Sequence, residues 1–317
     1  MNLDTLDADI IIIGGGAAGL SAAQYGARAN LKTLLIEEIA PGGQALVIDN
    51  LENYPGFPEK ISGFEFTQRL TQQALNFGAE ILNATVNSVE KKDNTFIVNT
   101  SKGVKRSYVI ILATGAKHKI LNIPGEKEFT GKGVSYCATC DGPFFRGKKM
   151  LVVGGGDAAC DESMFLSKLT DKVVLIHRRD RFRAQKSLVA NVTHNKNIEI
   201  RLNHELLEII GDEDGKRVSK VSLLNNLDGV TYEENFDAVF IFAGSFPQNS
   251  LAAHADKDEA GYIITDQNMQ TNEPGFFVVG DVRATPFRQL VVAAGEGAIA
   301  NHRASHYIDG LAGHQYI

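Results

Sequence analysis

One short pattern occurs twice in this 317-residue chain and restricts its fold more than any other feature. Each copy is an apolar run, a turn of three glycines and a stretch of small residues. Gly14–Gly19 reads G-G-G-A-A-G and Gly154–Ala159, which begins 140 residues later, reads G-G-G-D-A-A. We call these segments the first and second glycine fingerprints. A strand entering a helix through such a turn is typical of nucleotide-binding βαβ units, so the duplication predicts two of them.

The rest of the chain alternates short apolar runs with helical patterns, which predicts parallel α/β architecture. One helix has a clear start, because Ser62 and Glu65 have capping-box spacing. The expected strands are 9–13, 33–36, 86–89, 96–100, 108–112, 150–153, 173–176 and 276–279. One helix is expected directly after each fingerprint, and two further helices are expected at about 62–77 and 292–309.

Composition restricts the class of protein. The chain is 44% hydrophobic and 22% charged, as in globular proteins, and its length suggests two domains. Lys and Arg number 32 against 38 Asp and Glu, so the net charge of −6 argues against a nucleic-acid partner. We find no apolar run near the roughly 20 residues that span a membrane. The first nine residues contain three acids where a secretory signal would be basic, which predicts a cytoplasmic protein.

The two fingerprints are followed by opposite charges. Glu37 stands 18 residues after Gly19, where a carboxylate accepts a hydrogen bond from an unphosphorylated ribose, as in FAD or NAD. The alternative for Glu37 is a solvated acid at a strand end. The second fingerprint is followed by His177-Arg178-Arg179 and then Arg183, and guanidinium groups suit the 2′-phosphate of NADP(H).

For these arginines the alternative is a basic solvated turn in which Asp180 pairs with one of them. Opposite charges at equivalent places are hard to explain in that way. Two different dinucleotides on one chain imply electron transfer between them, with a flavin as the natural intermediary.

Cys137 and Cys140 form a Cys-x-x-Cys pair. A structural zinc site needs two further ligands, and only Cys160 remains among the cysteines, so we expect a redox dithiol and no metal. Asp141, beside Cys140, is a candidate proton donor for thiol chemistry, or alternatively a turn residue before Gly142. We expect Cys160 to be a packed core residue.

Together these segments resemble the low-molecular-weight, bacterial-type thioredoxin reductases over essentially the whole chain. The most specific segment is Cys137–Asp141, placed just before the second fingerprint. The resemblance rests on both fingerprints and on Pro41-Gly42-Gly43-Gln44, Glu52-Asn53-Tyr54-Pro55-Gly56, Ala113-Thr114-Gly115, Cys137–Asp141, His177–Ala184 and Gly280-Asp281-Val282.

The resemblance implies the cofactors and their sites. FAD would be bound by Gly14, Gly16, Ala17, Gly19, Glu37, Gly43, Gln44, Asn53, Thr114, Gly115, Gly280, Asp281, Arg288 and Gln289. NADPH would be bound by Gly154, Gly156, Asp157, Ala159, His177, Arg178, Arg179 and Arg183. Asp281 would bind the ribityl chain, and the glutamine and asparagine side chains of the first set would lie near the isoalloxazine ring.

The resemblance also implies two Rossmann-like domains with three-layer ββα architecture, one inserted into the other. The FAD-binding domain would comprise residues 1–118 and 247–317, and the NADPH-binding domain, with the cysteines, 119–246. The sequence pattern alone suggests a boundary near Met150. Three positions depart from the family pattern: Asp161 replaces a glutamate, Phe246 a small polar residue at the bend, and Ala17 a proline.

The implied reaction is NADPH-dependent reduction of thioredoxin or a thioredoxin-like protein by a homodimer. Cys140 would face the flavin and Cys137 would attack the partner, with the NADPH domain rotating between half-reactions. The alternatives are a peroxiredoxin-system reductase, a ferredoxin–NADP-type reductase and a non-enzymatic redox sensor. The first usually carries an extra thioredoxin-like module, and the second lacks the Cys-x-x-Cys pair.

Overall fold

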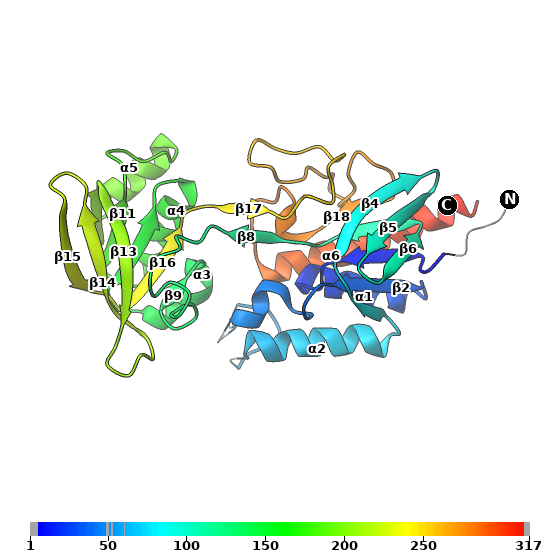
Figure 1. The fold of residues 1–317 in the computed structure, drawn as a ribbon, viewed down its shortest axis with the longest axis horizontal. Helices are drawn as coiled ribbons and strands as arrows, with labels where there is room; N and C mark the ends of the chain where they lie inside the picture. The colour runs from blue at the N-terminus through cyan, green and yellow to red at the C-terminus, as the bar shows by residue number, and fades with distance from the viewer. Residues whose placement is uncertain (1–5, 49–50, 52, 60, 314–317) are drawn as a thin grey trace. The chain divides into compact units, whose positions relative to one another are not determined.

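The computed structural model describes residues 6–48, 51, 53–59 and 61–313 (Figure 1). Glu52, which belongs to one of the family-like segments, and the first five residues lie outside the described residues. The chain divides into two compact units, one formed by Met1–Lys117 with Phe246–Ile317 and the other by His118–Ser245. The fold class is confirmed, because each unit contains a parallel five-stranded sheet built around one glycine fingerprint.

The first unit has a parallel sheet in the order β18-β7-β1-β2-β3 and an antiparallel sheet in the order β4-β5-β6. The parallel strands are β1 (Ile10–Ile13), β2 (Thr33–Glu37), β3 (Glu80–Asn83), β7 (Val109–Leu112) and β18 (Phe276–Val278). The antiparallel strands are β4 (Val86–Lys92), β5 (Thr95–Thr100) and β6 (Gly103–Ser107). The helices are α1 (Ala17–Arg28), α2 (Gly63–Asn76) and α6 (Leu290–Leu311), with 3₁₀ turns η1 (Gly43–Val47) and η3 (Gly280–Val282).

Strand β1 lies in the middle of three layers. Ile10 and Ile12 pack with α1 and α6, whereas Ile11 and Ile13 pack with Phe96 on β5. Successive side chains of a strand point to opposite faces, so a strand covered on both faces reads as an unbroken apolar run. The helices therefore cover one face of the parallel sheet and the antiparallel sheet covers the other.

The second unit repeats this arrangement, with sheet orders β12-β11-β10-β16-β9 and β13-β14-β15. The parallel strands are β9 (Val134–Ser135), β10 (Met150–Gly154), β11 (Val173–His177), β12 (Ile198–Leu202) and β16 (Ala238–Phe242). The antiparallel strands are β13 (His204–Gly211), β14 (Val218–Asn225) and β15 (Val230–Asn235). The helices are α3 (Ala138–Asp141), α4 (Asp157–Leu166) and α5 (Lys186–His194), with the 3₁₀ turn η2 (Gly142–Phe145).

The core of this unit alternates in the same way. Met150 and Val152 pack with Cys160 on α4, whereas Leu151 packs with residues of β13 and β14. The chain passes between the units through β8 (Ala116–His118) and β17 (Ser245–Pro247), which pair with each other.

A boundary near Met150, which the sequence pattern suggests, falls inside the second unit. Val134 and Ser135 form β9, which pairs in parallel with Val239 and Phe240 of β16. Residues 118–149 therefore share a sheet with the second fingerprint, because pairing with a strand about one hundred residues later completes that sheet. The sequence pattern also does not predict strands β3, β6, β8, β9 and β12 to β17, or helices α3 and α5.

The other expected strands and helices are confirmed to within a few residues. The hydroxyl of Ser62 accepts a hydrogen bond from the Glu65 N–H at 3.1 Å, so α2 is capped as its spacing predicts. The Glu65 carboxylate instead pairs with Arg69 at 2.7 Å, so the reciprocal half of the capping box is replaced by a salt bridge along the helix.

Candidate active site

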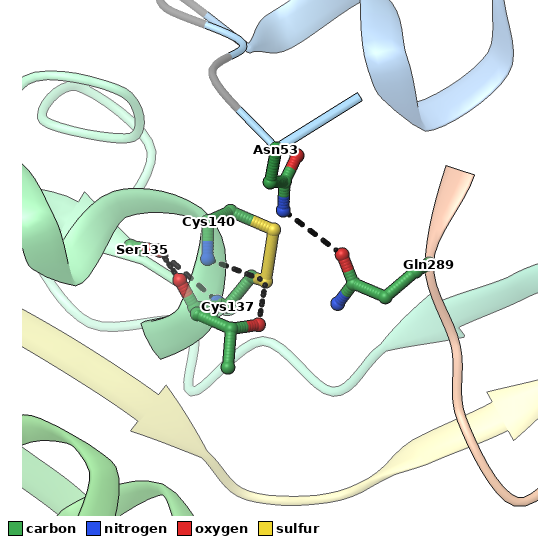
Figure 2. Close-up of a disulfide and its surroundings, with 6 residues drawn as sticks. Asn53, Ser135, Cys137, Cys140 and Gln289 are labelled. Carbon is green, nitrogen blue, oxygen red and sulfur yellow. Dashed lines mark hydrogen bonds between the residues drawn. A yellow bond between two sulfur atoms is a disulfide. The ribbon is translucent and has the colours of Figure 1, made fainter. Parts of the chain in front are cut away.

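A disulfide joins Cys137 and Cys140 at the start of α3, as Figure 2 shows. The Cys140 N–H donates a hydrogen bond to Cys137 Sγ at 3.2 Å. Thr139 Oγ1 lies 3.4 Å from the same sulfur, and because an oxidised sulfur carries no hydrogen, the hydroxyl is the donor. Two donors on one sulfur stabilise negative charge there once the disulfide is reduced, which is what an attacking thiolate requires.

Ser135 fixes the backbone that enters this turn. Its hydroxyl accepts from the Cys137 N–H at 3.0 Å and lies 3.2 Å from the Cys137 carbonyl oxygen. Ala138, between the cysteines, is fully buried and packs in the core beneath the sheet. The roles of Ser135 and Thr139 cannot be predicted from the sequence, because hydroxyl side chains near a Cys pair form no recognisable pattern.

Tyr136, which precedes the redox pair, is fixed on both sides. Its hydroxyl donates to Glu126 Oε1 at 2.9 Å, and burial with this carboxylate raises the pKa of Tyr136. Glu126 is only 3% exposed and also accepts from the N–H groups of Leu121 and Asn122. The ring of His118 stacks on Tyr136 with centroids 5.2 Å apart. The start of the second unit is therefore tied to the segment that carries Cys137.

Asp141 ends α3 beside Cys140 and is half-buried. Its backbone N–H donates to the Cys137 carbonyl at 3.2 Å. Its backbone therefore lies in a hydrogen-bonded turn, as expected of a turn residue, and its carboxylate belongs to the residue that directly follows Cys140. Cys160, by contrast, is a fully buried free thiol, and burial raises its pKa to about 11.

The first fingerprint leaves open space where a pyrophosphate would approach. A Cβ atom on Gly14 would stand 2.5 Å from the Ala113 carbonyl oxygen and one on Gly19 would stand 1.9 Å from the Gly14 oxygen, so both are required for close packing. A Cβ atom on Gly16 would meet nothing within 4 Å. Gly16 is the N-cap of α1, and the N-terminus of a 12-residue helix favours an anion. These residues fit a dinucleotide.

Glu37 lies at the end of β2 beside this turn. Its Oε2 accepts from the Gly15 N–H at 2.7 Å and its Oε1 accepts from the Ile39 N–H at 3.0 Å. Each carboxylate oxygen can accept more than one hydrogen bond, so Glu37 can still accept one from a ribose.

The second fingerprint is built in the same way. A Cβ atom on Gly154 would stand 2.7 Å from the Phe242 oxygen, whereas one on Gly156, the N-cap of α4, would meet nothing within 4 Å. Ala159 is fully buried and closes the packing against Gly154. The Asp157 carboxylate accepts from the Gln185 N–H at 2.8 Å and from its Nε2 at 3.0 Å. The helix start is therefore tied to the chain entering α5.

The four basic residues at and after the end of β11 differ in position. Arg178, Arg179 and Arg183 are exposed, and the Arg183 N–H donates to the Gly155 carbonyl at 2.7 Å. The ring of His177 is 6% exposed and stacks on Phe182. Burial and the positive charge of the three arginines lower the pKa of His177, so the ring is neutral at pH 7. The His177 ring is thus buried against Gly155 of the fingerprint, whereas the three arginines place positive charge on the exposed surface.

The residues expected near the flavin lie in the first unit. Asn53 Nδ2 donates to Gln289 Oε1 at 3.0 Å (Figure 2), and Gln44 Nε2 donates to the Ala116 carbonyl at 2.7 Å. Thr114 directly precedes Gly115, and its hydroxyl donates to the Gln248 carbonyl at 2.7 Å. Gly43 begins η1 with a φ of +56°, and a Cβ atom there would stand 3.1 Å from the Cα of Gly16.

Asp281 and Arg288 belong to the same part of the first unit. The pKa of Asp281 is raised above its usual value, chiefly by burial. The positive charge of Arg288 partly opposes this increase, and the negative charge of Glu296 adds to it. The Arg288 guanidinium lies 4.0 Å from the centre of the Tyr262 ring, which is a cation–π contact. Tyr262 is a further residue that the sequence analysis did not identify.

Comparison with known proteins agrees with this arrangement. Residues 8–297 match the family model described as pyridine nucleotide-disulphide oxidoreductase. The chain is 52% identical over 305 residues to a thioredoxin reductase of Treponema pallidum, which covers 96% of this chain and 98% of the relative. It is 41% identical to that of Bacillus subtilis, over 96% and 95% of the two chains. The chain belongs to the thioredoxin reductases of this family.

A solved structure leads to the same family. The crystal structure of thioredoxin reductase from Streptococcus pyogenes matches with a TM-score of 0.91 and 39% identity, over 96% of this chain and 98% of that chain. Thioredoxin reductases use FAD and NADPH, and the open helix starts at Gly16 and Gly156 fit two dinucleotides.

Two further features of the described part of the chain bear on function. None of its helices is both long and apolar enough to cross a membrane. Among the same residues, no group of three or more His, Cys, Asp or Glu side chains is arranged to hold a metal ion.

Proposed function

We propose that this chain is an NADPH-dependent thioredoxin reductase in which Cys137 and Cys140 are the redox-active pair. The observation that carries the proposal is the disulfide between them, set in the same unit as the second fingerprint and the arginine cluster. The near-full-length similarity to thioredoxin reductases supports it. The substrate is the disulfide of thioredoxin or of a thioredoxin-like protein.

The two units divide the cofactors. The unit formed by Met1–Lys117 and Phe246–Ile317 binds FAD, since it contains the first fingerprint and Glu37. The unit formed by His118–Ser245 binds NADPH, with Arg178, Arg179 and Arg183 at the 2′-phosphate. Asp281 binds the ribityl chain of FAD, and Gln44, Asn53 and Gln289 lie near its ring. These roles are supported by the residues that each unit contains.

The chain's own residues perform the disulfide exchange. FAD and NADPH, when bound, would supply the two electrons that, together with two protons, convert the Cys137–Cys140 disulfide to two thiols. The Cys137 thiolate, stabilised by the Cys140 N–H and the Thr139 hydroxyl, attacks one sulfur of the partner's disulfide. A mixed disulfide forms, and Asp141 supplies a proton to the departing sulfur. Cys140 then gives its proton back to Asp141 and attacks Cys137 Sγ, which restores the Cys137–Cys140 disulfide. The partner's second sulfur leaves and takes up the proton that Cys137 released, so the partner departs as a dithiol.

The finer assignments extend this proposal. Cys140 faces the flavin, and the unit that carries it rotates on the two crossing segments between the half-reactions. Rotation is needed because the cysteines must be shielded against the flavin in one step and exposed to a partner protein in another. We further propose that the enzyme is a cytoplasmic homodimer.

The direct test measures electron flow from NADPH to a protein disulfide. The purified protein should be yellow, and NADPH should bleach its visible absorbance. Oxidised bacterial thioredoxin should then restore the colour, because its disulfide accepts the electrons and reoxidises the protein. NADH should act far less efficiently. A protein that NADPH bleaches but that no thioredoxin reoxidises would contradict the proposed substrate. A colourless protein without NADPH oxidation would favour a redox sensor.

A further inference from the structure

Glu296 is a buried carboxylate in the middle of α6, only 5% exposed. Its Oε2 accepts from the Gly280 backbone N–H at 2.7 Å. Its Oε1 accepts from the guanidinium of Arg283 and lies 3.4 Å from the Thr285 hydroxyl. We call these residues, Gly280, Arg283, Thr285 and Glu296, the Glu296 cluster. A buried charge is stable only when it is paired and hydrogen-bonded, and this cluster meets both conditions.

Arg283 is itself held on two sides. Its side chain is 11% exposed, and its Nε donates to the Thr265 hydroxyl at 3.0 Å while its Nη1 pairs with Glu296. A guanidinium that is fixed in this way holds the Glu296 carboxylate in place and orients it toward Gly280.

Glu296 Oε2 holds the backbone of a turn that has little conformational freedom. Gly280 begins η3 with a φ of +72°, and a Cβ atom there would stand 3.2 Å from the Cβ of Ala18 in the first turn of α1. The neighbouring helix contact is closer still, because a Cβ atom on Gly297 would stand 2.2 Å from the Ala18 carbonyl oxygen. The turn is therefore packed against α1, and Glu296 holds its first N–H.

Asp281 follows Gly280 in this turn, so any movement of the Gly280 N–H moves the Asp281 carboxylate. The negative charge of Glu296 also contributes to raising the pKa of Asp281, after burial, which indicates that the two carboxylates are near each other. Arg288 acts in the opposite direction on Asp281.

We propose that Glu296 is a positioning residue for FAD, because its carboxylate, paired with Arg283, holds the Gly280–Asp281 turn in the orientation in which Asp281 binds the cofactor. The inference rests on the proposed function, which assigns Asp281 to FAD. Glu296 touches no cofactor atom in this account and acts only through the turn. The small residues around it on α6 gave no sign of this role in the sequence.

The test compares FAD retention and stability in three variants. Holoprotein of each is diluted, and released FAD is measured by its fluorescence; thermal unfolding is followed separately. Glu296→Gln removes the charge that the cluster needs. Glu234→Gln is the matched control, because Glu234 is a half-buried carboxylate that pairs with Arg201 in the other unit. The double variant Arg283→Met with Glu296→Leu replaces the ion pair by apolar side chains of similar size, which proteins tolerate well.

We expect Glu296→Gln to raise the dissociation constant of FAD by about tenfold or more, the effect of losing one hydrogen bond to a charged group. Glu234→Gln should lower the melting temperature yet leave FAD affinity within about twofold of wild type. The double variant should recover the melting temperature of the wild type. Its dissociation constant for FAD should nevertheless remain about tenfold higher, because the Gly280 N–H has lost its hydrogen-bond acceptor.

Affinity in the double variant within about twofold of wild type would overturn the positioning role, and this variant decides the question even if Glu296→Gln does not fold. Equal loss of FAD in Glu234→Gln would also overturn it, since the effect would then be one of stability alone. Wild-type protein that retains no FAD would refute the cofactor assignment in the proposed function, which is a different result.

Discussion

Gly155 lies directly against the ring of His177, and a Cβ atom on this glycine would stand 2.3 Å from two ring atoms. The first fingerprint contains the equivalent pair, in which a Cβ atom on Gly15 would stand 3.1 Å from Glu37 Oε2. In both units the middle glycine therefore makes room for the side chain that ends the second strand. That side chain is a carboxylate bound to the turn in one unit and a buried neutral ring in the other.

The glycines of the second fingerprint should separate stability from binding. Gly155→Ala forces the His177 ring to move, and overpacking of this kind costs about 1–3 kcal/mol of unfolding free energy. Gly156→Ala is the matched control, since its Cβ atom meets nothing within 4 Å and its φ of −102° suits alanine. We expect Gly156→Ala to change the free energy of unfolding by no more than about 0.5 kcal/mol. The same variant should bind NADPH more weakly, because the added methyl group fills the space of the pyrophosphate. Urea unfolding and NADPH titration measure the two effects, and identical behaviour of the variants would contradict this account.

Preference for NADPH should depend on the exposed arginines. Arg178→Ala removes a charge-assisted contact to the 2′-phosphate, worth about 1.5–3 kcal/mol, or roughly tenfold or more in NADPH affinity. NADH has no 2′-phosphate and should be nearly unaffected. Steady-state kcat/KM for both nucleotides checks this, with Lys186→Ala as a neighbouring basic control. An unchanged ratio of the two values in Arg178→Ala would remove the basis for the specificity.

Loss of one redox cysteine should stop only the second half of the reaction. Cys140→Ser should retain FAD and its bleaching by NADPH, because electrons reach the flavin without passing through sulfur, while thioredoxin reduction is lost. Cys160→Ala is the control, since Cys160 is a fully buried thiol that should not take part. Thioredoxin reduction that persists in Cys140→Ser would refute the assignment of the redox pair.

Glu162 should make stability depend on pH near neutrality. Burial, followed by the charge of Asp161, raises its pKa from 4.5 to about 7, and its Oε2 has no hydrogen-bond partner among the described residues. Between these values the unfolded chain ionises while the folded protein keeps the proton, so stability falls as the pH rises. Glu162→Gln should therefore gain on the order of 1–3 kcal/mol over wild type at pH 8, with little difference below pH 4. Urea unfolding across this range measures the difference, and a constant gap between the two proteins would contradict the raised pKa.

Glu234 should act in the opposite direction, at acid pH. Hydrogen bonds from Arg201, and then from Lys149, lower its pKa from 4.5 to about 2. Its stabilising contribution is present above the unfolded pKa and is lost as the pH falls toward 2. Wild type should therefore lose on the order of 2–3 kcal/mol more than Glu234→Gln between pH 6 and pH 2. Parallel acid-unfolding curves for the two proteins would show that the pair does not titrate in this way.

The two βαβ units, the Cys137–Cys140 pair and the charge that follows each fingerprint can be recognised without a structure. These features depend on residues within one strand–turn–helix segment, where periodicity and glycine content restrict the backbone directly. For that reason the expected strands at 9–13 and 150–153 match β1 and β10 closely.

The distant residues that support these segments become known only from the folded arrangement. Residues 118–149 join the second unit because β9 pairs with β16, a contact between Val134 and Val239 that no local pattern encodes. His177 belongs to a basic run in the sequence, yet its ring is buried, because Gly155 leaves space for it. No local pattern marks Glu126 or Glu296, and only folding encloses each among its hydrogen-bond donors. Local interactions select the elements, whereas burial and long-range pairing depend on the arrangement of all elements at once.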